Sequence, residues 1–222
     1  MILDGVIFDL DGTLADTIPI CIAACREALS KVAGSHLEDH EIVALFGPTE
    51  EGIIRRLMPD RWQFGLQVFL EAYERAHEDC RAPFAGIETA LDLLKQRGVS
   101  LAIVTGKGQP SAAISLRYLG VAGHFDAIET GSPDGNIKSL QIRNVLTRWG
   151  APPHRVAYVG DSAADMRAAK EAGVIALGAA WAASASFDRL NAEAPAVIFR
   201  STESFVHWIE AHVEPNDGRR PS

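Results

Sequence analysis

Residues 5–17 read GVIFDLDGTLADT, an apolar run that ends abruptly in two carboxylates and a glycine. The apolar part is typical of a buried strand, and the change in polarity places Asp9 and Asp11 at its carboxyl end, the edge of an open α/β sheet where ligands bind. Residues two apart on an extended chain point to the same side, and Gly12 lets the backbone turn away. We therefore expect both acids to face one site. A plain polar turn is the alternative, because Asp and Gly are common turn formers.

The composition indicates a folded protein without a nucleic-acid surface. The chain has 222 residues, of which 47% are hydrophobic, and can bury a full core. Its formal charge of -8 argues against binding to nucleic acid or an anionic membrane, where clustered Lys and Arg are expected. The three cysteines lack metal-type spacing and indicate reduced thiols. No apolar run reaches the ~18 residues of a membrane helix, and the first strand leaves no room for a secretion signal, so we predict a cytoplasmic protein.

Two segments with different secondary-structure patterns follow the first strand. Residues 16–82 are helical throughout, with helices expected at 18–32, 37–46, 50–57 and 62–80, and they form an inserted helical domain. After residue 83, strands and helices alternate. The strands are expected at 100–104, 125–129, 156–159, 174–177 and 196–199, and the helices at 86–97, 111–119, 138–149, up to 172, and 202–212. This alternation predicts an α/β fold with a doubly wound, mostly parallel, Rossmann-like sheet. We assign residues 1–15 and 83–213 to this core domain and 214–222 to a polar tail.

The loops after the expected strands carry residues suited to phosphoryl transfer. Asp9 can attack phosphorus in line and form an aspartyl phosphate, which divides one difficult hydrolysis into two displacements. Asp11 suits the general acid that protonates the leaving alcohol and then, as a base, activates water. A hard cation is needed to offset the charge on the phosphoryl oxygens. Asp9, the backbone carbonyl of Asp11 and Asp161 suit Mg²⁺, which prefers oxygen ligands, and Asp165 would hold a metal-bound water or orient its neighbours.

Three further residues offer contacts to a phosphoryl group. Thr105 supplies a hydroxyl, Gly106 a backbone N–H and Lys138 a positive charge. Each candidate also has an ordinary structural explanation. A threonine at a strand end commonly forms a turn with its own backbone, and a lone lysine is commonly a solvated helix residue. Asp161 and Asp165 have a helix N-cap and a surface acid as their structural alternative, which the presence of Asp9 and Asp11 disfavours.

These motifs, in this order, resemble those of the haloacid dehalogenase superfamily. The stretch FDLDGTLADT at 8–17 resembles the first motif, Thr105 in IVTG the second, Lys138 the third, and GDSAAD at 160–165 the fourth. The helical insert of residues 16–82 is similar to the cap domain of phosphoglycolate phosphatase-like members. The resemblance implies a phosphoric monoester hydrolase in which Asp9 is the nucleophile, Asp11 the acid and base, and Mg²⁺ the cofactor.

The resemblance also narrows the reaction. Dehalogenases and phosphonatases of the family lack the second aspartate, so Asp11 argues against both, and Thr13 favours hydrolysis over mutase activity. The stretch FGPTEEGIIRR at 46–56 resembles the glycine-centred substrate loop of phosphoglycolate and pyrophosphate phosphatases. Gly47 and Thr49 would then approach the ligand and Arg55 would supply charge, although a plain inter-helix turn fits equally well.

We therefore expect a Mg²⁺-dependent phosphatase that acts on a small phosphomonoester, with phosphoglycolate-like substrates preferred. A sugar-phosphate mutase of the same family, or a phosphoacceptor or binding module that does not hydrolyse its ligand, is the alternative. The expected partner is a small phosphorylated metabolite. We expect no contact with nucleic acid or membrane, and either a monomer or a homodimer.

Overall fold

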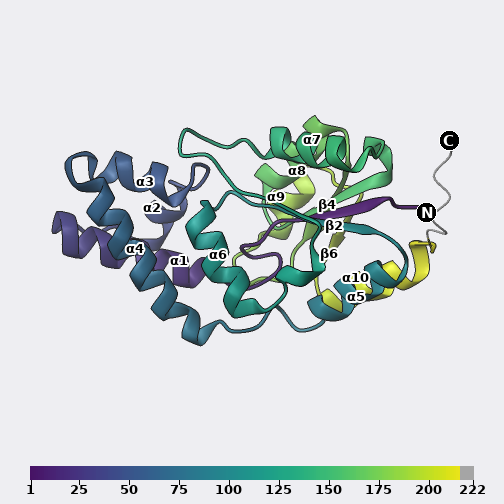
Figure 1. Cartoon of the computed structure of the whole chain (residues 1–222), viewed down its shortest axis with the longest axis horizontal. Coiled ribbons are helices and arrows are strands. Elements are labelled where there is room, and N and C mark those ends of the chain that lie inside the picture. Colours follow the sequence, from purple (N-terminus) through teal and green to yellow (C-terminus); the bar gives the residue numbers. More distant parts are fainter. Residues whose placement is uncertain (216–222) are drawn as a thin grey trace.

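The computed structural model describes residues 1–215 and has a six-stranded parallel sheet at its centre, in the order β3-β2-β1-β4-β5-β6 (Figure 1). The strands are β1 (Gly5–Phe8), β2 (Ser100–Val104), β3 (Ala127–Glu129), β4 (Val156–Gly160), β5 (Ile175–Ala179) and β6 (Val197–Phe199). Strand β1 lies between β2 and β4, and Phe8 pairs with Ile103 on one side and Val159 on the other. This confirms the predicted Rossmann-like α/β fold and places the end of β1 at the centre of the sheet edge.

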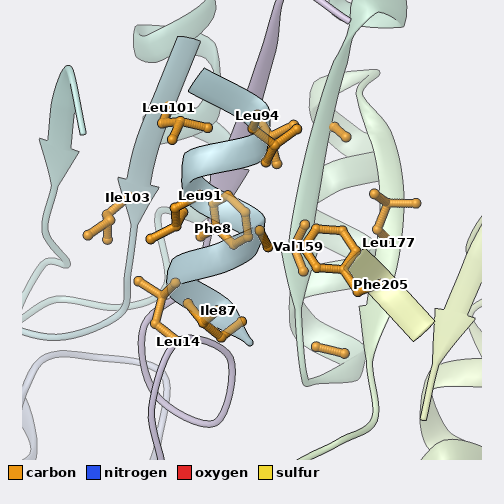
Figure 2. Packing of buried hydrophobic residues seen from close by; sticks show 14 of the residues in the cluster. Phe8, Leu14, Ile87, Leu91, Leu94, Leu101, Ile103, Val159, Leu177 and Phe205 are labelled. Atoms are coloured by element: carbon orange, nitrogen blue, oxygen red, sulfur yellow. The ribbon is translucent and has the colours of Figure 1, made fainter. Parts of the chain in front are cut away.

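Helices cover both faces of the sheet, and each face has its own apolar cluster. The core helices are α5 (Ile87–Gln96), α6 (Gln109–Leu119), α7 (Lys138–Trp149), α8 (Ala163–Ala172), α9 (Phe187–Ala192) and α10 (Thr202–His212). On one face, Phe8 packs with Leu91, Leu94 and Phe205 of α5 and α10 (Figure 2). On the other face, Ile7 packs against side chains of α7 and α8. The neighbouring residues Ile7 and Phe8 of β1 therefore pack in clusters on opposite faces of the sheet, because successive side chains of a strand point to opposite faces.

Four helices form the inserted cap beside the sheet (Figure 1). They are α1 (Ile18–Ala28), α2 (Asp39–Val43), α3 (Glu50–Leu57) and α4 (Trp62–Ala76). They enclose an apolar cluster of their own, with Phe69 and Tyr73 of α4 among its largest buried side chains. The first helix is shorter than predicted because the chain widens into a π-helical turn at Leu29–Ala33 and ends in the left-handed conformation at Gly34.

The cap touches the core through backbone and polar contacts. The Thr49 N–H donates to the Ser132 carbonyl at 3.0 Å, and the hydroxyls of Tyr73 and Ser115 lie 2.9 Å apart. Helix α3 also passes close to the core loop at Pro133. A Cβ on Gly52 would collide with the Pro133 carbonyl, so only glycine allows this approach.

Of the polar tail expected at 214–222, all but the first two residues lie outside the described part of the chain. Within residues 1–215, no helix combines the length and the apolar character that a membrane span requires.

Candidate active site

The turn after β1 fixes the two acids of the first motif. The Asp9 N–H donates to the Val159 carbonyl at 2.9 Å, which keeps this residue in register with β4. The chain then reverses at Gly12, which has φ +72°, and a Cβ there would collide with the Asp161 carboxylate. Glycine is therefore required both for the backbone conformation and for the approach of the loop after β4. As a result, the ends of two adjacent strands bring Asp9 and Asp161 together.

Three buried carboxylates meet beside one lysine. One oxygen from each of Asp9, Asp161 and Asp165 lies within 4.8 Å of the other two. The Lys138 ammonium lies 3.0 Å from Asp9 Oδ1 and 2.6 Å from Asp165 Oδ1. The contact with Asp9 is ionic, because among the described residues its buried Oδ1 has no hydrogen bond of good geometry. The structure thus brings together four of the residues that the sequence singled out.

Asp165 is fully used in orienting its neighbours. Its Oδ1 accepts from Lys138 and, at 3.2 Å, from the Tyr158 hydroxyl, while Oδ2 accepts from the N–H and the hydroxyl of Ser162. Ser162 is the N-cap of α8 and Asp165 its third residue, so the pair forms a capping box. Asp165 is fully buried, so the surface-acid alternative is wrong for this residue: its carboxylate completes the capping box and also holds Lys138 in place.

Burial and mutual repulsion disturb the protonation of this cluster. Burial is the largest factor and raises the pKa of Asp9 from 3.8 to about 7, partly offset by Lys138. Burial, reinforced by the charge of Asp165, also raises the pKa of Asp161 well above its usual value. Burial opposes the charge on Lys138, but Asp165 and Asp9 raise its pKa well above normal. The site thus holds more negative charge than one lysine balances, which suits a divalent cation.

Asp11 lies on the cavity side of this cluster and has different partners. Its Oδ1 accepts a hydrogen bond from the Thr17 hydroxyl and lies 3.2 Å from the Lys107 ammonium. Both contacts are made to the same oxygen, so Oδ2 is left for another partner. The two acids of the motif therefore occupy distinct surroundings, with Lys138 beside Asp9 and Lys107 beside Asp11.

Lys107 joins the core loop to the cap. Its ammonium is 3.1 Å from Glu50 Oε1 of α3 and 4.3 Å from the centre of the Tyr73 ring. Glu50 in turn accepts from the Gly108 N–H and the Ser111 hydroxyl, both at 2.8 Å. Burial opposes the charge of Lys107, but Asp11, Tyr73 and other neighbours raise its pKa well above normal. A buried cation thus lies between one acid of the core and one of the cap.

A cavity of about 700 Å³ opens above these side chains, between the cap and the sheet edge. Asp9, Asp11, Lys107 and Lys138 lie in its wall on the core side, and α1, α2 and α3 contribute apolar residues from the cap. A cavity of this size is typical of a small-molecule site.

Other residues named from the sequence have varied positions. Gly47 and Gly106 line the cavity. Thr105 is fully buried and its hydroxyl accepts from the Lys107 N–H at 3.2 Å, the turn contact anticipated as the structural alternative. Thr49 is the N-cap of α3 and accepts from Gly52. Arg55 lies away from the cavity wall: it pairs with Glu51 at 2.5 Å and stacks on the Trp62 ring.

The sequence interpretation did not include Lys107 and Glu50 among the site residues. Lys107 was within reach, because it follows Thr105 by two residues in a loop already assigned to the reactive edge. Glu50 had no such signal. In the sequence it is one of two adjacent acids at a helix start, and only the packing of α3 on α6 distinguishes it from Glu51.

Comparison with known proteins agrees with this geometry. Residues 6–179 match the family described as Haloacid dehalogenase-like hydrolase. The chain is 30% identical over 187 residues to phosphoglycolate phosphatase from Neisseria meningitidis serogroup A, covering 79% of this chain and 80% of the relative. It is 25% identical over 209 residues to pyrophosphatase PpaX from Bacillus velezensis, covering 91% and 94% of the two chains.

A solved structure has the same fold over nearly the whole chain. The crystal structure of a hydrolase from Pseudomonas syringae superimposes with a TM-score of 0.77 at 22% identity, covering 95% of this chain and all of that one. The likeness extends over both the parallel sheet and the helical insert.

Proposed function

The chain belongs to the haloacid dehalogenase-like hydrolase family, and on that premise we propose that it is a Mg²⁺-dependent phosphatase that hydrolyses a small phosphomonoester through an aspartyl phosphate on Asp9. The observation that carries the proposal is the buried cluster of Asp9, Asp161 and Asp165 with Lys138 beneath a cavity large enough for a small molecule. The names of its relatives, phosphoglycolate phosphatase and pyrophosphatase, support a phosphatase.

The proposed reaction has two displacements. An oxygen of ionised Asp9 attacks phosphorus and forms an aspartyl phosphate, while the bond from phosphorus to the alcohol oxygen breaks and Asp11 gives that oxygen a proton. Water then attacks the same phosphorus, Asp11 takes the proton from the water, and the bond to Asp9 breaks to release inorganic phosphate. Lys138 favours the ionised form of Asp9 and partly offsets the rise in its pKa that burial causes.

The same carboxylates fit a Mg²⁺ ion. Asp9 and Asp161, with the backbone carbonyl of Asp11, would hold it. Burial, reinforced by neighbouring carboxylates, raises the pKa of both carboxyl groups, and a divalent cation would favour their ionised forms. When bound, the ion supplies positive charge against the phosphoryl oxygens. Asp165 is not needed as a ligand, because Lys138, Tyr158 and Ser162 already occupy it.

Phosphoglycolate is the first substrate to test, because a relative that is 30% identical carries that name. Recognition of its carboxylate needs a cation near the leaving group. The sequence suggested Arg55 for this purpose, but Arg55 lies outside the cavity wall, and the buried Lys107 is already paired with Glu50 and Asp11.

The proposal is tested by phosphate release from p-nitrophenyl phosphate, phosphoglycolate, pyrophosphate and sugar phosphates, with Mg²⁺ and with excess chelator. We expect turnover of at least one monoester that stops when the metal is removed and returns when Mg²⁺ is added. A stable phosphorylated protein without turnover would instead support the phosphoacceptor alternative, and conversion of a sugar phosphate to its isomer would support the mutase.

A further inference from the structure

The cap side of the cavity wall is mainly apolar. Beside Asp39, His40 and Glu50, it contains six apolar side chains, Ile18, Cys21, Ile22, Val43, Phe46 and Ile53. Val43 and Phe46 are 43% and 39% exposed, so two large apolar side chains line the cavity without a protein partner covering them fully. Apolar surface gains free energy when a ligand removes it from water.

The two buried lysines of this wall are already paired with carboxylates. Lys107 lies between the carboxyl groups of Asp11 and Glu50, at 3.2 and 3.1 Å, and Glu50 balances its charge even when Asp11 carries the proton that it donates. Lys138 likewise lies between Asp9 and Asp165. The remaining basic residues of the wall, His40 and Arg189, are exposed to solvent and do not belong to the buried floor beside Asp11.

We propose that the substrate's alcohol is uncharged and apolar, and that it packs against Val43 and Phe46; this deepens the proposed phosphatase function and rests on it. A carboxylate in the same place would lose its hydration beside Glu50 and would have to share Lys107 with it. A hydrocarbon group has no charge whose hydration would be lost there, and it removes the apolar wall from contact with water. The Glu50–Lys107 pair thus selects against a second negative charge.

A matched pair of substrates tests the proposal. Isobutyl phosphate has the shape of phosphoglycolate, with two methyl groups in place of the carboxylate oxygens. We expect kcat/KM for isobutyl phosphate to exceed that for phosphoglycolate by about tenfold or more. In a series of n-alkyl phosphates, kcat/KM should rise about fourfold for each added methylene until the wall is covered.

Two variants with matched controls test whether Glu50 and Phe46 cause the expected substrate preference. Glu50→Gln leaves Lys107 with only one acid, so the preference for isobutyl phosphate over phosphoglycolate should fall about tenfold. Glu51→Gln, whose partner Arg55 lies outside the cavity, should leave the ratio unchanged. Phe46→Ala should flatten the n-alkyl series, whereas Phe64→Ala, an exposed aromatic of α4 away from the wall, should not.

The outcomes separate this inference from the function on which it rests. Mg²⁺-dependent hydrolysis of p-nitrophenyl phosphate, combined with higher kcat/KM for phosphoglycolate than for isobutyl phosphate, would overturn the apolar-alcohol proposal and leave the phosphatase intact. An n-alkyl series without a slope, or a ratio that Glu50→Gln and Glu51→Gln change equally, would also overturn it. Absence of turnover with every monoester would reject the phosphatase itself.

Discussion

The edge of the sheet and the wall of the cap contribute opposite kinds of surface to the same cavity. At the edge, buried charges contact one another: Lys138 bridges Asp9 and Asp165 across distances of 3.0 and 2.6 Å. The cap contributes one buried acid, Glu50, two exposed polar residues, Asp39 and His40, and mainly apolar side chains such as Phe46. A reaction that develops charge needs fixed dipoles and ions at the reacting atoms, whereas recognition of an alcohol needs a fitting shape. Under the proposed function, the core would carry out the reaction and the cap would select the substrate.

The strongest test of the core's part is removal of the nucleophile. Asp9→Asn should lower kcat for p-nitrophenyl phosphate on the order of 10⁴-fold or more, because an amide cannot form the acyl phosphate. Phosphate release under saturating substrate measures this. Asp16→Asn, an exposed acid of the same stretch, is the control and should keep its activity. Equal rates for wild type and Asp9→Asn would show that Asp9 is not the nucleophile and that the reaction takes place elsewhere than at the sheet edge.

The next effect depends on the leaving group. Asp11→Asn should slow hydrolysis of alkyl phosphates by about 10²- to 10⁴-fold, because their alcohols need a proton as they depart. The first step with p-nitrophenyl phosphate should be affected much less, since p-nitrophenolate leaves without protonation. Single-turnover release of the two alcohols measures the contrast. Identical losses for both substrates would show that Asp11 is structural and not an acid.

The excess negative charge at the edge predicts how Mg²⁺ stabilises the fold. The pKa of Asp9 is raised from 3.8 to about 7 in the folded state, so the folded protein binds more protons than the unfolded chain between these values. Stability from this group is therefore highest below about pH 4 and falls as the pH rises to about 7, by on the order of a few kcal/mol. A bound cation relieves the repulsion of the ionised form. Mg²⁺ should accordingly raise Tm more at pH 8 than at pH 5.

Thermal unfolding with and without Mg²⁺ at the two pH values checks this expectation. Asp161→Asn removes one of the proposed ligands and should abolish most of the difference. A rise in Tm that is the same at both pH values, or that persists in Asp161→Asn, would place the ion elsewhere than the buried carboxylates.

The smallest effect concerns a single hydrogen-bonding group under the core cluster. Tyr158 donates to the Val104 carbonyl at 3.0 Å and contacts Asp165 at 3.2 Å. Tyr158→Phe should lower the free energy of unfolding by about 1 kcal/mol, because these buried acceptors lose a donor. Urea denaturation measures it, with Tyr118→Phe, which is half-buried, as the control. A cost no larger than that of the control would mean that the hydroxyl does not support the cluster.

Much of the core was predictable because strand ends carry their own signals. The helices Glu50–Leu57, Lys138–Trp149 and Thr202–His212 and the strand Ser100–Val104 have the predicted limits, since each is bounded by a cap, a proline or a glycine or by a sharp change in polarity. The cap helices α1 and α2 are shorter than predicted. Their limits depend on packing around Ile42 and on the turn at Gly34, which periodicity alone does not reveal.

One physical reason explains which predicted site residues the structure brings together and which it places elsewhere. Asp9, Lys138, Asp161 and Asp165 follow or begin elements at one sheet edge, so their order along the chain was enough to bring them together. Arg55 was expected in the cavity because of its loop, but helix periodicity turns it toward Glu51 and Trp62.

The sequence by itself determined the parallel sheet, the helical insert and the acids at the end of β1, because alternation of apolar segments and the turn at Gly12 are local properties of the chain. Only the tertiary structure decided that the Lys107 ammonium lies between Asp11 and Glu50. That contact joins three segments far apart in the sequence, and burial gives it its strength. No local pattern encodes it, since Glu50 and Glu51 differ only in the direction in which helix α3 presents them to the core.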